Sequence, residues 1–293
     1  MNRLQVLASG MLTTVQDLGR FGYAQYGISA SGAADALALR AGNLLTGNAE
    51  NAAALEMTLT GGEFAFEHDA VIAITGADFA ASHPMWQPLK VRGGETVRFG
   101  GARNGARCYL AIRGGLAVPR TMGSASVHVM TGVGGRPLRR GDVLPVGDAA
   151  VRRPRQPTRG FPTLEGVTRL RVTAGPQAHA FGEELYRGEY TVSEESNRMG
   201  IRLQGPALAS PEGQMITEGV CLGAVQAPPG GQPIILFVEH QTTGGYPKPA
   251  NVISADFWRV GQLRPRDRVC FERATMEGAL ELLRDQEAWL YSL

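Results

Sequence analysis

The chain has 293 residues, of which 43% are hydrophobic and 19% charged, and its formal net charge is +2. This composition excludes an intrinsically disordered chain and leaves room for one large domain or two smaller ones. The small net charge gives no reason to expect nucleic acid or a membrane surface as a partner. No apolar run approaches the about 20 residues that cross a bilayer.

The N-terminal segment and the cysteines indicate a cytoplasmic protein. Residues 1–7 are typical of a first strand and lack the long apolar region of a signal peptide. The three cysteines, Cys108, Cys221 and Cys270, lie far apart within apolar segments. An odd and scattered set predicts reduced thiols rather than a disulfide framework or a zinc site. The five histidines are not spaced as metal ligands, so we expect no metal.

Glycine and proline punctuate the chain between short apolar runs. There are 39 glycines and 17 prolines, and this pattern is typical of a mainly β protein. The runs that predict strands are 71–75, 96–99, 108–112, 170–173 and 234–238. We therefore expect a mainly β fold with a few short helices.

Three segments have helical patterns. Residues 33–45 are rich in Ala and Leu, and Ser31 is placed to cap their first turn while Gly47 ends the last. Residues 177–186 predict a short helix. Residues 276–290 predict an amphipathic C-terminal helix with its leucines toward one face.

An Arg- and Pro-rich segment divides the chain. Residues 151–160 have almost no apolar side chains and no interleaved aromatic residue, which favours a solvated linker over a nucleic-acid site. We place the domains at 1–150 and 164–293, with a linker over 151–163. The two halves share faint parallels, such as Arg-x-Gly at 20–22 and at 198–200, which are compatible with a duplication that later gained insertions.

The loop 241–248, with the sequence Gln-Thr-Thr-Gly-Gly-Tyr-Pro-Lys, is the most informative segment. It follows the apolar run 234–238, and its two glycines are expected to take positive φ and to let the backbone approach a ligand. The 29 basic residues comprise 27 Arg and only two Lys, Lys90 and Lys248. A lysine in so arginine-rich a chain suggests a need for a compact, movable ammonium. An incidental surface lysine on a turn explains the composition equally well.

Other polar residues gather around glycine turns in the first half. Gln16, Asp17 and Arg20 surround one such turn, and Ser31 and Asp35 follow it. A carboxylate and a guanidinium this close can pair with each other, or they can bind an anionic ligand. The spacing of Ser31 favours helix capping over anion binding.

Two more candidates lie at turns in the second half. Arg198 stands beside a glycine, and Glu218 precedes the strand run 234–238, as does the amide Gln226. A carboxylate with a neighbouring cation suits proton transfer next to an anionic substrate. The sequence has no Walker-type phosphate loop, no dinucleotide fingerprint and no Gly-x-Ser-x-Gly elbow.

Several strings together resemble one family. They are Thr-Val-Gln-Asp-Leu-Gly-Arg at 14–20, Ser31-Gly32 with Asp35, Thr-Gly-Ala-Asp at 75–78, Asn-Arg-Met-Gly at 197–200, Glu218-Gly219 and the loop 241–248. In this order they are similar to the biotin-dependent carboxyltransferase-like family, also called KipA or the second allophanate hydrolase subunit. Its bacterial members are assigned as the C subunit of ATP-dependent 5-oxoprolinase. The resemblance covers the chain from about residue 4 to residue 271.

The resemblance implies a fold and a site. The expected fold is two cyclophilin-like β-barrel domains whose facing surfaces form a cleft. The cleft residues carried over, or inferred from them, are catalytic Lys248, Arg20, Arg198, Asp17 and Glu218, and substrate-binding Gln16, Ser31, Asp35, Gln241, Thr242, Thr243, Gly244, Gly245 and Tyr246.

The resemblance also implies a function. The expected protein is a hydrolase component that is active only in a hetero-oligomer, together with a KipI-like protein and a LamB/YcsF-type protein. The complex opens 5-oxoproline to L-glutamate with ATP hydrolysis, and ATP binds without a phosphate loop, at a site of another type or at an interface within the complex. One alternative is a regulatory antagonist of a KipI-like kinase inhibitor. The other is the carboxyltransferase component of a urea carboxylase or allophanate hydrolase system, which alone calls for biotin.

Overall fold

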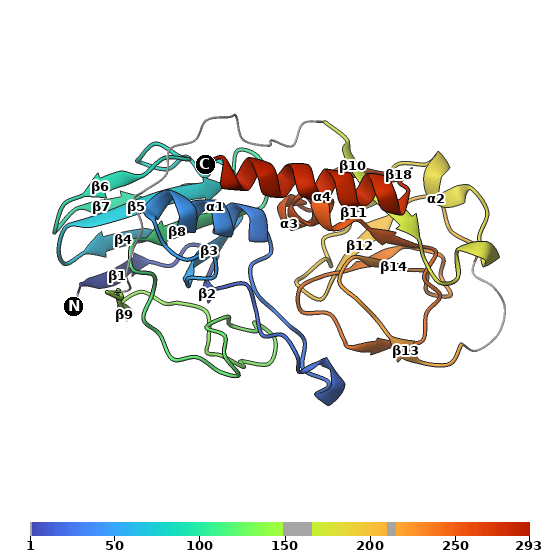
Figure 1. Cartoon of the computed structure of the whole chain (residues 1–293), viewed down its shortest axis with the longest axis horizontal. Coiled ribbons are helices and arrows are strands. Elements are labelled where there is room, and N and C mark those ends of the chain that lie inside the picture. The colour runs from blue at the N-terminus through green and yellow to red at the C-terminus, as the bar shows by residue number, and fades with distance from the viewer. Residues whose placement is uncertain (1, 149–165, 210–214) are drawn as a thin grey trace. The chain divides into compact units, whose positions relative to one another are not determined.

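The computed structural model describes residues 2–148, 166–209 and 215–293 (Figure 1). The chain divides into two compact units. Unit 1 comprises Met1–Arg20, Ser31–Thr163 and Ala288–Leu293, and unit 2 comprises Phe21–Ala30 and Leu164–Glu287. The predicted linker, 151–163, lies outside the described residues.

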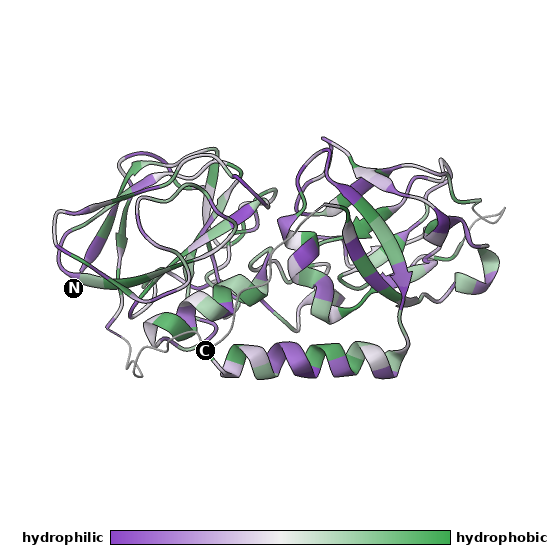
Figure 2. Ribbon diagram, turned by 90° about the horizontal axis from the view of Figure 1, so that it is seen from above, coloured by the Kyte–Doolittle hydropathy of each residue, from purple (hydrophilic) through white to green (hydrophobic). Residues whose placement is uncertain are grey.

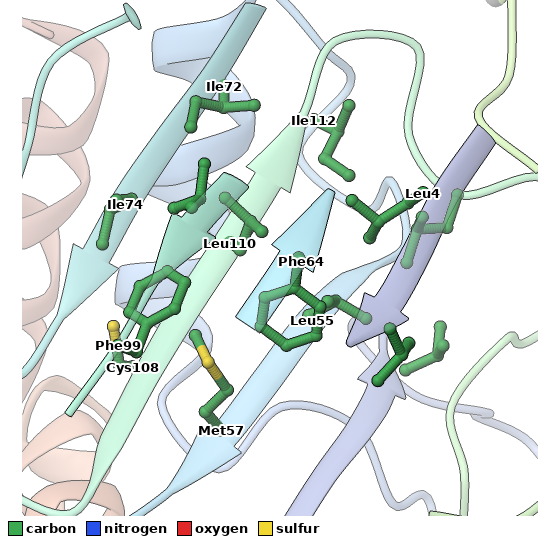
Figure 3. Close-up of a cluster of buried hydrophobic side chains, with 14 of the residues drawn as sticks. Leu4, Leu55, Met57, Phe64, Ile72, Ile74, Phe99, Cys108, Leu110 and Ile112 are labelled. Atoms are coloured by element: carbon green, nitrogen blue, oxygen red, sulfur yellow. The ribbon is translucent and has the colours of Figure 1, made fainter. Parts of the chain in front are cut away.

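Unit 1 contains two antiparallel sheets in its described part. The first has the order β7 (Thr96–Arg98), β4 (Glu63–Phe66), β1 (Arg3–Ala8) and β9 (Val143–Pro145). The second has the order β2 (Leu12–Gln16), β3 (Ala54–Thr58), β8 (Arg107–Ile112), β5 (Ala70–Gly76) and β6 (Leu89–Val91). Alternate side chains of both sheets form one apolar core, in which Leu4, Phe64 and Leu110 are fully buried (Figure 3).

The helix α1 (Ala36–Thr46) covers part of β5 and β8. Its N-cap is Asp35, whose Oδ1 accepts from the N–H of Ala38 at 2.9 Å. The prediction that Ser31 caps this helix was wrong, because the helix begins three residues later than the Ala/Leu pattern does. Gly47 ends the helix in the left-handed region with φ 84°, as predicted.

Unit 2 is built around a closed barrel. Its strand order is β10 (Thr168–Ala174), β17 (Ala250–Val252), β14 (Ala224–Gln226), β15 (Ile234–Leu236), β12 (Gly200–Gln204), β11 (Tyr190–Val192) and β18 (Arg268–Arg273). A separate two-stranded ribbon pairs β13 (Glu218–Gly219) with β16 (Thr243–Gly244). The mainly β prediction is confirmed, and the cyclophilin likeness stays a prediction.

The helices other than α1 are short, except the last. They are η1 (Ala24–Tyr26), η2 (Ala178–Ala180), α2 (Glu184–Arg187), η3 (Ser254–Asp256), α3 (Phe257–Gln262) and α4 (Met276–Tyr291). The predicted helix 177–186 is therefore two separate turns. The C-terminal helix is confirmed, and Figure 2 shows hydrophilic and hydrophobic residues alternating along it. Leu290 is buried whereas Leu280 is exposed. No helix among the described residues is long and apolar enough to cross a membrane.

Candidate functional site

The β13–β16 ribbon organises the loop 241–248. Within the loop, Thr243 and Gly244 form the short strand β16, which pairs with Glu218 and Gly219 of β13. Glu218 lies directly opposite Gly244. Two segments that are far apart in the sequence are thereby joined, and the carboxylate singled out at residue 218 meets the predicted loop.

Lys248 and Glu218 form an ion pair. The Nζ atom of Lys248 lies 2.5 Å from Oε1 of Glu218, and it also donates to the carbonyl oxygen of Tyr246 at 3.2 Å. The Lys248 side chain is 3% exposed and that of Glu218 is 41% exposed. A buried ammonium is therefore held by a carboxylate that still reaches the solvent.

Gln177 fixes this pair from a third segment. Its Nε2 donates to Oε1 of Glu218 at 3.1 Å, and its Oε1 accepts from the N–H of Lys248 at 3.0 Å. Gly175 permits this approach, because a Cβ there would overlap the carbonyl oxygen of Lys248. The hydrogen bonds from Lys248 and then Gln177 hold the pKa of Glu218 below its ordinary value. The sequence offered no signal for Gln177 beyond the preceding Gly-Pro turn.

A second pair of polar side chains lies beside the ribbon. Gln226 is 1% exposed at the end of β14, and Gln241 donates to its Oε1 at 3.3 Å. Neither Gly244 nor Gly245 takes a positive φ, so that prediction was wrong. What Gly244 provides is space, since a Cβ there would lie 2.6 Å from Nε2 of Gln226.

The remaining loop residues border this arrangement. The carbonyl oxygen of Thr242 accepts from the N–H of Val220 at 3.0 Å, which extends the ribbon by one bond. Thr243 is exposed, and Tyr246 is 44% exposed, so both present side chains to the solvent.

Asp17 in unit 1 is saturated with hydrogen bonds. Its carboxylate accepts from the hydroxyls of Ser124 and Ser126 at 2.6 Å each, from the N–H of Ala125 at 2.7 Å and from the N–H of Gly19 at 2.8 Å. Burial raises the pKa of Asp17, but these donors outweigh it and leave the pKa below its ordinary value. The predicted catalytic carboxylate thus anchors the segment 124–126, which sequence reasoning did not single out.

Three other predicted residues meet the same segment of unit 1. Arg20 donates through Nη2 to the carbonyl oxygen of Ser126, and Gln16 donates to that of Val127 at 2.9 Å. Ser31 also donates to Val127, at 3.3 Å. Gln16, Asp17, Arg20 and Ser31 are therefore brought together around residues 124–127.

Asp35 belongs to a different network. Its N–H donates to the hydroxyl of Tyr109 at 2.7 Å, and that hydroxyl donates to Oε2 of Glu56 at 2.7 Å. Glu56 also accepts from the N–H of Ala34 at 2.8 Å. All of these groups are buried at the start of α1, so their shared effect is to fix the beginning of that helix.

Arg198 lies in unit 2 and pairs with a residue that the sequence did not point to. Its Nε atom lies 2.5 Å from Oε1 of Glu239, and both side chains are buried. Glu239 stands two residues before Gln241, so this ion pair anchors the start of the loop 241–248. The two predicted arginines thus belong to different units.

Comparison with known proteins identifies the family. The family profile described as the carboxyltransferase domain, subdomain A and B, matches residues 26–273. The chain belongs to this family.

The chain is similar to relatives of two kinds. The chain is 39% identical to the C subunit of 5-oxoprolinase from Escherichia coli, over 99% of this chain and 97% of the relative. It is 38% identical to the corresponding C subunit from Haemophilus influenzae, over 94% and 93%. It is also 32% identical to urea amidolyase of Saccharomyces cerevisiae, over 99% of this chain but 18% of the relative.

Solved structures of the family agree. The urea amidolyase of K. lactis superposes with a TM-score of 0.90 at 30% identity, over 98% of this chain and 20% of that one. The protein TTHA0988 superposes with a TM-score of 0.84 at 35% identity, over 93% and 55%. This chain therefore spans only part of each of these longer polypeptides.

The second lysine of this carboxyltransferase domain lines a pocket of about 850 Å³ in unit 1. Lys90 is the cross-strand partner of Val71, and the N–H of Arg113 donates to the carbonyl oxygen of Val71 at 2.8 Å. Arg113 and Arg92 also line the pocket. Asp69 and Asp148 line it too and offset part of the positive charge. Among the residues that the structure describes, no group of His, Cys, Asp and Glu could hold a metal ion.

Proposed function

We propose that the chain is the C subunit of an ATP-dependent 5-oxoprolinase and opens 5-oxoproline to L-glutamate within a complex. The observation that carries this proposal is the match to 5-oxoprolinase C subunits over nearly the whole length of both chains. The urea amidolyases share the domain, but this chain spans only about a fifth of their length.

The Lys248–Glu218 pair suits the chemistry of ring opening. An amide is a poor electrophile, and attack on it places negative charge on the carbonyl oxygen. An ammonium that is already fixed and desolvated stabilises such charge more than a solvated one does. Lys248 has this character, because only 3% of its side chain is exposed.

Glu218 supplies the complementary function. Hydrogen bonds lower the pKa of Glu218, so it is a carboxylate at neutral pH. Its exposed face can accept a proton from an attacking water, and the proton passes to the ring nitrogen as the C–N bond breaks. Its second role is to position Lys248, because the two side chains form an ion pair at 2.5 Å. In this proposal Lys248 stabilises the negative charge that develops on the carbonyl oxygen, and Glu218 accepts the proton from the attacking water.

ATP enters the proposal as a co-substrate that drives the opening of the ring. The sequence has no phosphate loop, and the Lys90 pocket combines three cations with two carboxylates. We assign ATP binding to the assembled complex, with a KipI-like protein and a LamB/YcsF-type protein as its other members. No step is assigned to ATP on residues of this chain.

A carboxyltransferase activity is the second candidate, because urea amidolyase is also a relative. The two candidates differ in a simple requirement, since only the second needs a biotinyl carrier. Turnover of 5-oxoproline without biotin supports the first, and biotin-dependent consumption of urea supports the second. A stable complex with a KipI-like protein and no turnover of either compound would indicate a regulatory role.

The direct test is the Lys248→Ala variant in the reconstituted complex. We expect 5-oxoproline-dependent ATP hydrolysis to fall by about a hundredfold or more, since a charge-stabilising group is lost. Co-purification with the other members of the complex should be unchanged. Lys90→Ala is the matched control and should retain full turnover. Undiminished turnover in Lys248→Ala would contradict the proposed role.

A further inference from the structure

A buried hydrogen-bond donor near the Lys248–Glu218 pair has no partner. The side chain of Gln226 is 1% exposed, and its Nε2 makes no hydrogen bond within the part of the chain that the structure describes. Its Oε1, by contrast, accepts from Gln241. Buried polar groups in folded proteins are almost always paired, because an unpaired one loses its bonds to water without replacement. The exception calls for an explanation.

The unpaired donor packs against the side of Gly244 on which another residue would carry its side chain. A Cβ built on Gly244 would lie 2.6 Å from Nε2 of Gln226, 3.6 Å from Nε2 of Gln241 and 3.2 Å from a methyl group of Val220. Two amide nitrogens therefore converge on the side of Gly244 where any other residue would carry its side chain. Gln241 uses one N–H on Gln226, which leaves its second N–H to offer to a ligand.

The strand pairing in the ribbon places the Glu218 side chain, and with it Lys248, on the same face as the two amides. Residues directly opposite each other in an antiparallel pair project from the same face. Glu218 is opposite Gly244, so its carboxylate projects from the face on which the two amides converge. Val220, two residues further along, lies on that face as well, in agreement with its contact distance. Lys248 reaches the same face through its ion pair with Glu218.

We propose that the amide N–H groups of Gln226 and Gln241, which lie beside Gly244, bind the ring carbonyl oxygen of the lactam. This inference rests on the proposed function and names the group of the substrate that the site recognises. Two neutral donors suit a neutral carbonyl oxygen, and their bonds strengthen as that oxygen gains negative charge during ring opening. A substrate without the carbonyl leaves both donors unpaired and is rejected.

The test compares a ligand that has the carbonyl with one that lacks it. Calorimetric binding of 5-oxoproline and of L-proline is measured for the wild-type complex and for the Gln226→Met complex. The charged ring amine of L-proline is common to both complexes, so the change in preference between them reports the contribution of Gln226 to recognition of the carbonyl. We expect the wild-type complex to favour 5-oxoproline by at least about tenfold. Gln226→Met should reduce this preference by about tenfold and should lower kcat/KM for 5-oxoproline by a similar factor.

The unfolding midpoint shows whether a variant loses substrate recognition or loses stability. Gln226→Met removes the buried, unpaired Nε2 together with one long hydrogen bond from Gln241 and puts an apolar group of similar length in their place, so the unfolding midpoint should change little. Gly244→Ala should lose the preference too, because the new Cβ displaces the amide of Gln226. Gly219→Ala is the matched control in the same ribbon, since a Cβ there meets nothing within 4 Å, and it should behave as wild type.

The outcomes distinguish this inference from the proposed function. A wild-type complex that turns over 5-oxoproline, with Gln226→Met keeping the full preference over L-proline, would overturn the donor pair alone. A wild-type complex that neither binds nor turns over 5-oxoproline would overturn the proposed function and this inference together.

Discussion

Asp17 and Glu218 are both carboxylates at glycine turns, yet their surroundings differ. Asp17 is 3% exposed and accepts hydrogen bonds from two serine hydroxyls and two backbone N–H groups. Glu218 is 41% exposed and is held by one ammonium and one amide. The first carboxylate is saturated by protein donors, and the second keeps part of its surface free. The same chemical group therefore holds a loop in unit 1 and is available for chemistry in unit 2.

The cationic side chains differ in the same way, by whether their partners are buried or open to the solvent. Arg198 is buried against Glu239, and Arg20 donates to a carbonyl oxygen of the 124–127 segment. Both guanidinium groups thus contact buried protein partners. Lys248 is buried as well, but its carboxylate partner is open to the solvent. The accessibility of its partner, rather than its charge, distinguishes Lys248 from the two arginines, and it is the reason that we propose the Lys248–Glu218 pair as the reactive one.

The largest expected effect in this comparison is a loss of stability at Asp17. Asp17→Asn replaces an acceptor by an amide whose NH₂ faces donors, so at least one bond becomes unfavourable. We expect the free energy of unfolding to fall by about 2–3 kcal/mol, as measured by urea denaturation. Asp285→Asn, at an exposed position of α4, is the matched control and should change it by less than about 0.5 kcal/mol. An unchanged stability in Asp17→Asn would contradict the anchoring role.

A smaller expected effect is the pH dependence of the stability that Asp17 contributes. The pKa of Asp17 is lowered in the folded state, so its stabilising contribution is complete above the unfolded value, about 3.9. That contribution is lost as the pH falls through the lower folded pKa. The stability difference between wild type and Asp17→Asn should therefore be constant from about pH 7 to about pH 5 and shrink below about pH 4. A difference that grows on acidification would contradict this account.

Much of the fold follows from local pattern. Glycine punctuation indicates a mainly β chain, the apolar spacing of 276–290 predicts α4, and Gly47 marks the end of α1. The start of α1 does not follow from its Ala/Leu pattern. Asp35 caps it because Tyr109 and Glu56, distant in sequence, fix the backbone at that residue.

The site is only partly predictable for the same reason. The loop 241–248 stands out by its glycines and its rare lysine, and Glu218 is a visible carboxylate. Their pairing depends on a ribbon of two residues per strand, which is too short to leave a periodic signal. Gln177 and Glu239 contribute through tertiary contacts alone, and no local sequence pattern predicts their roles.

The central claim is that Lys248 and Glu218 act as one unit, and a double-mutant cycle tests it most directly. The measurement is kcat/KM for 5-oxoproline in the reconstituted complex for Lys248→Ala, Glu218→Gln and the double variant. If the two groups act together, the double variant is no slower than Lys248→Ala alone, and the coupling exceeds about 1 kcal/mol. Fully additive losses would contradict the claim, because they would mean that each group works without the other.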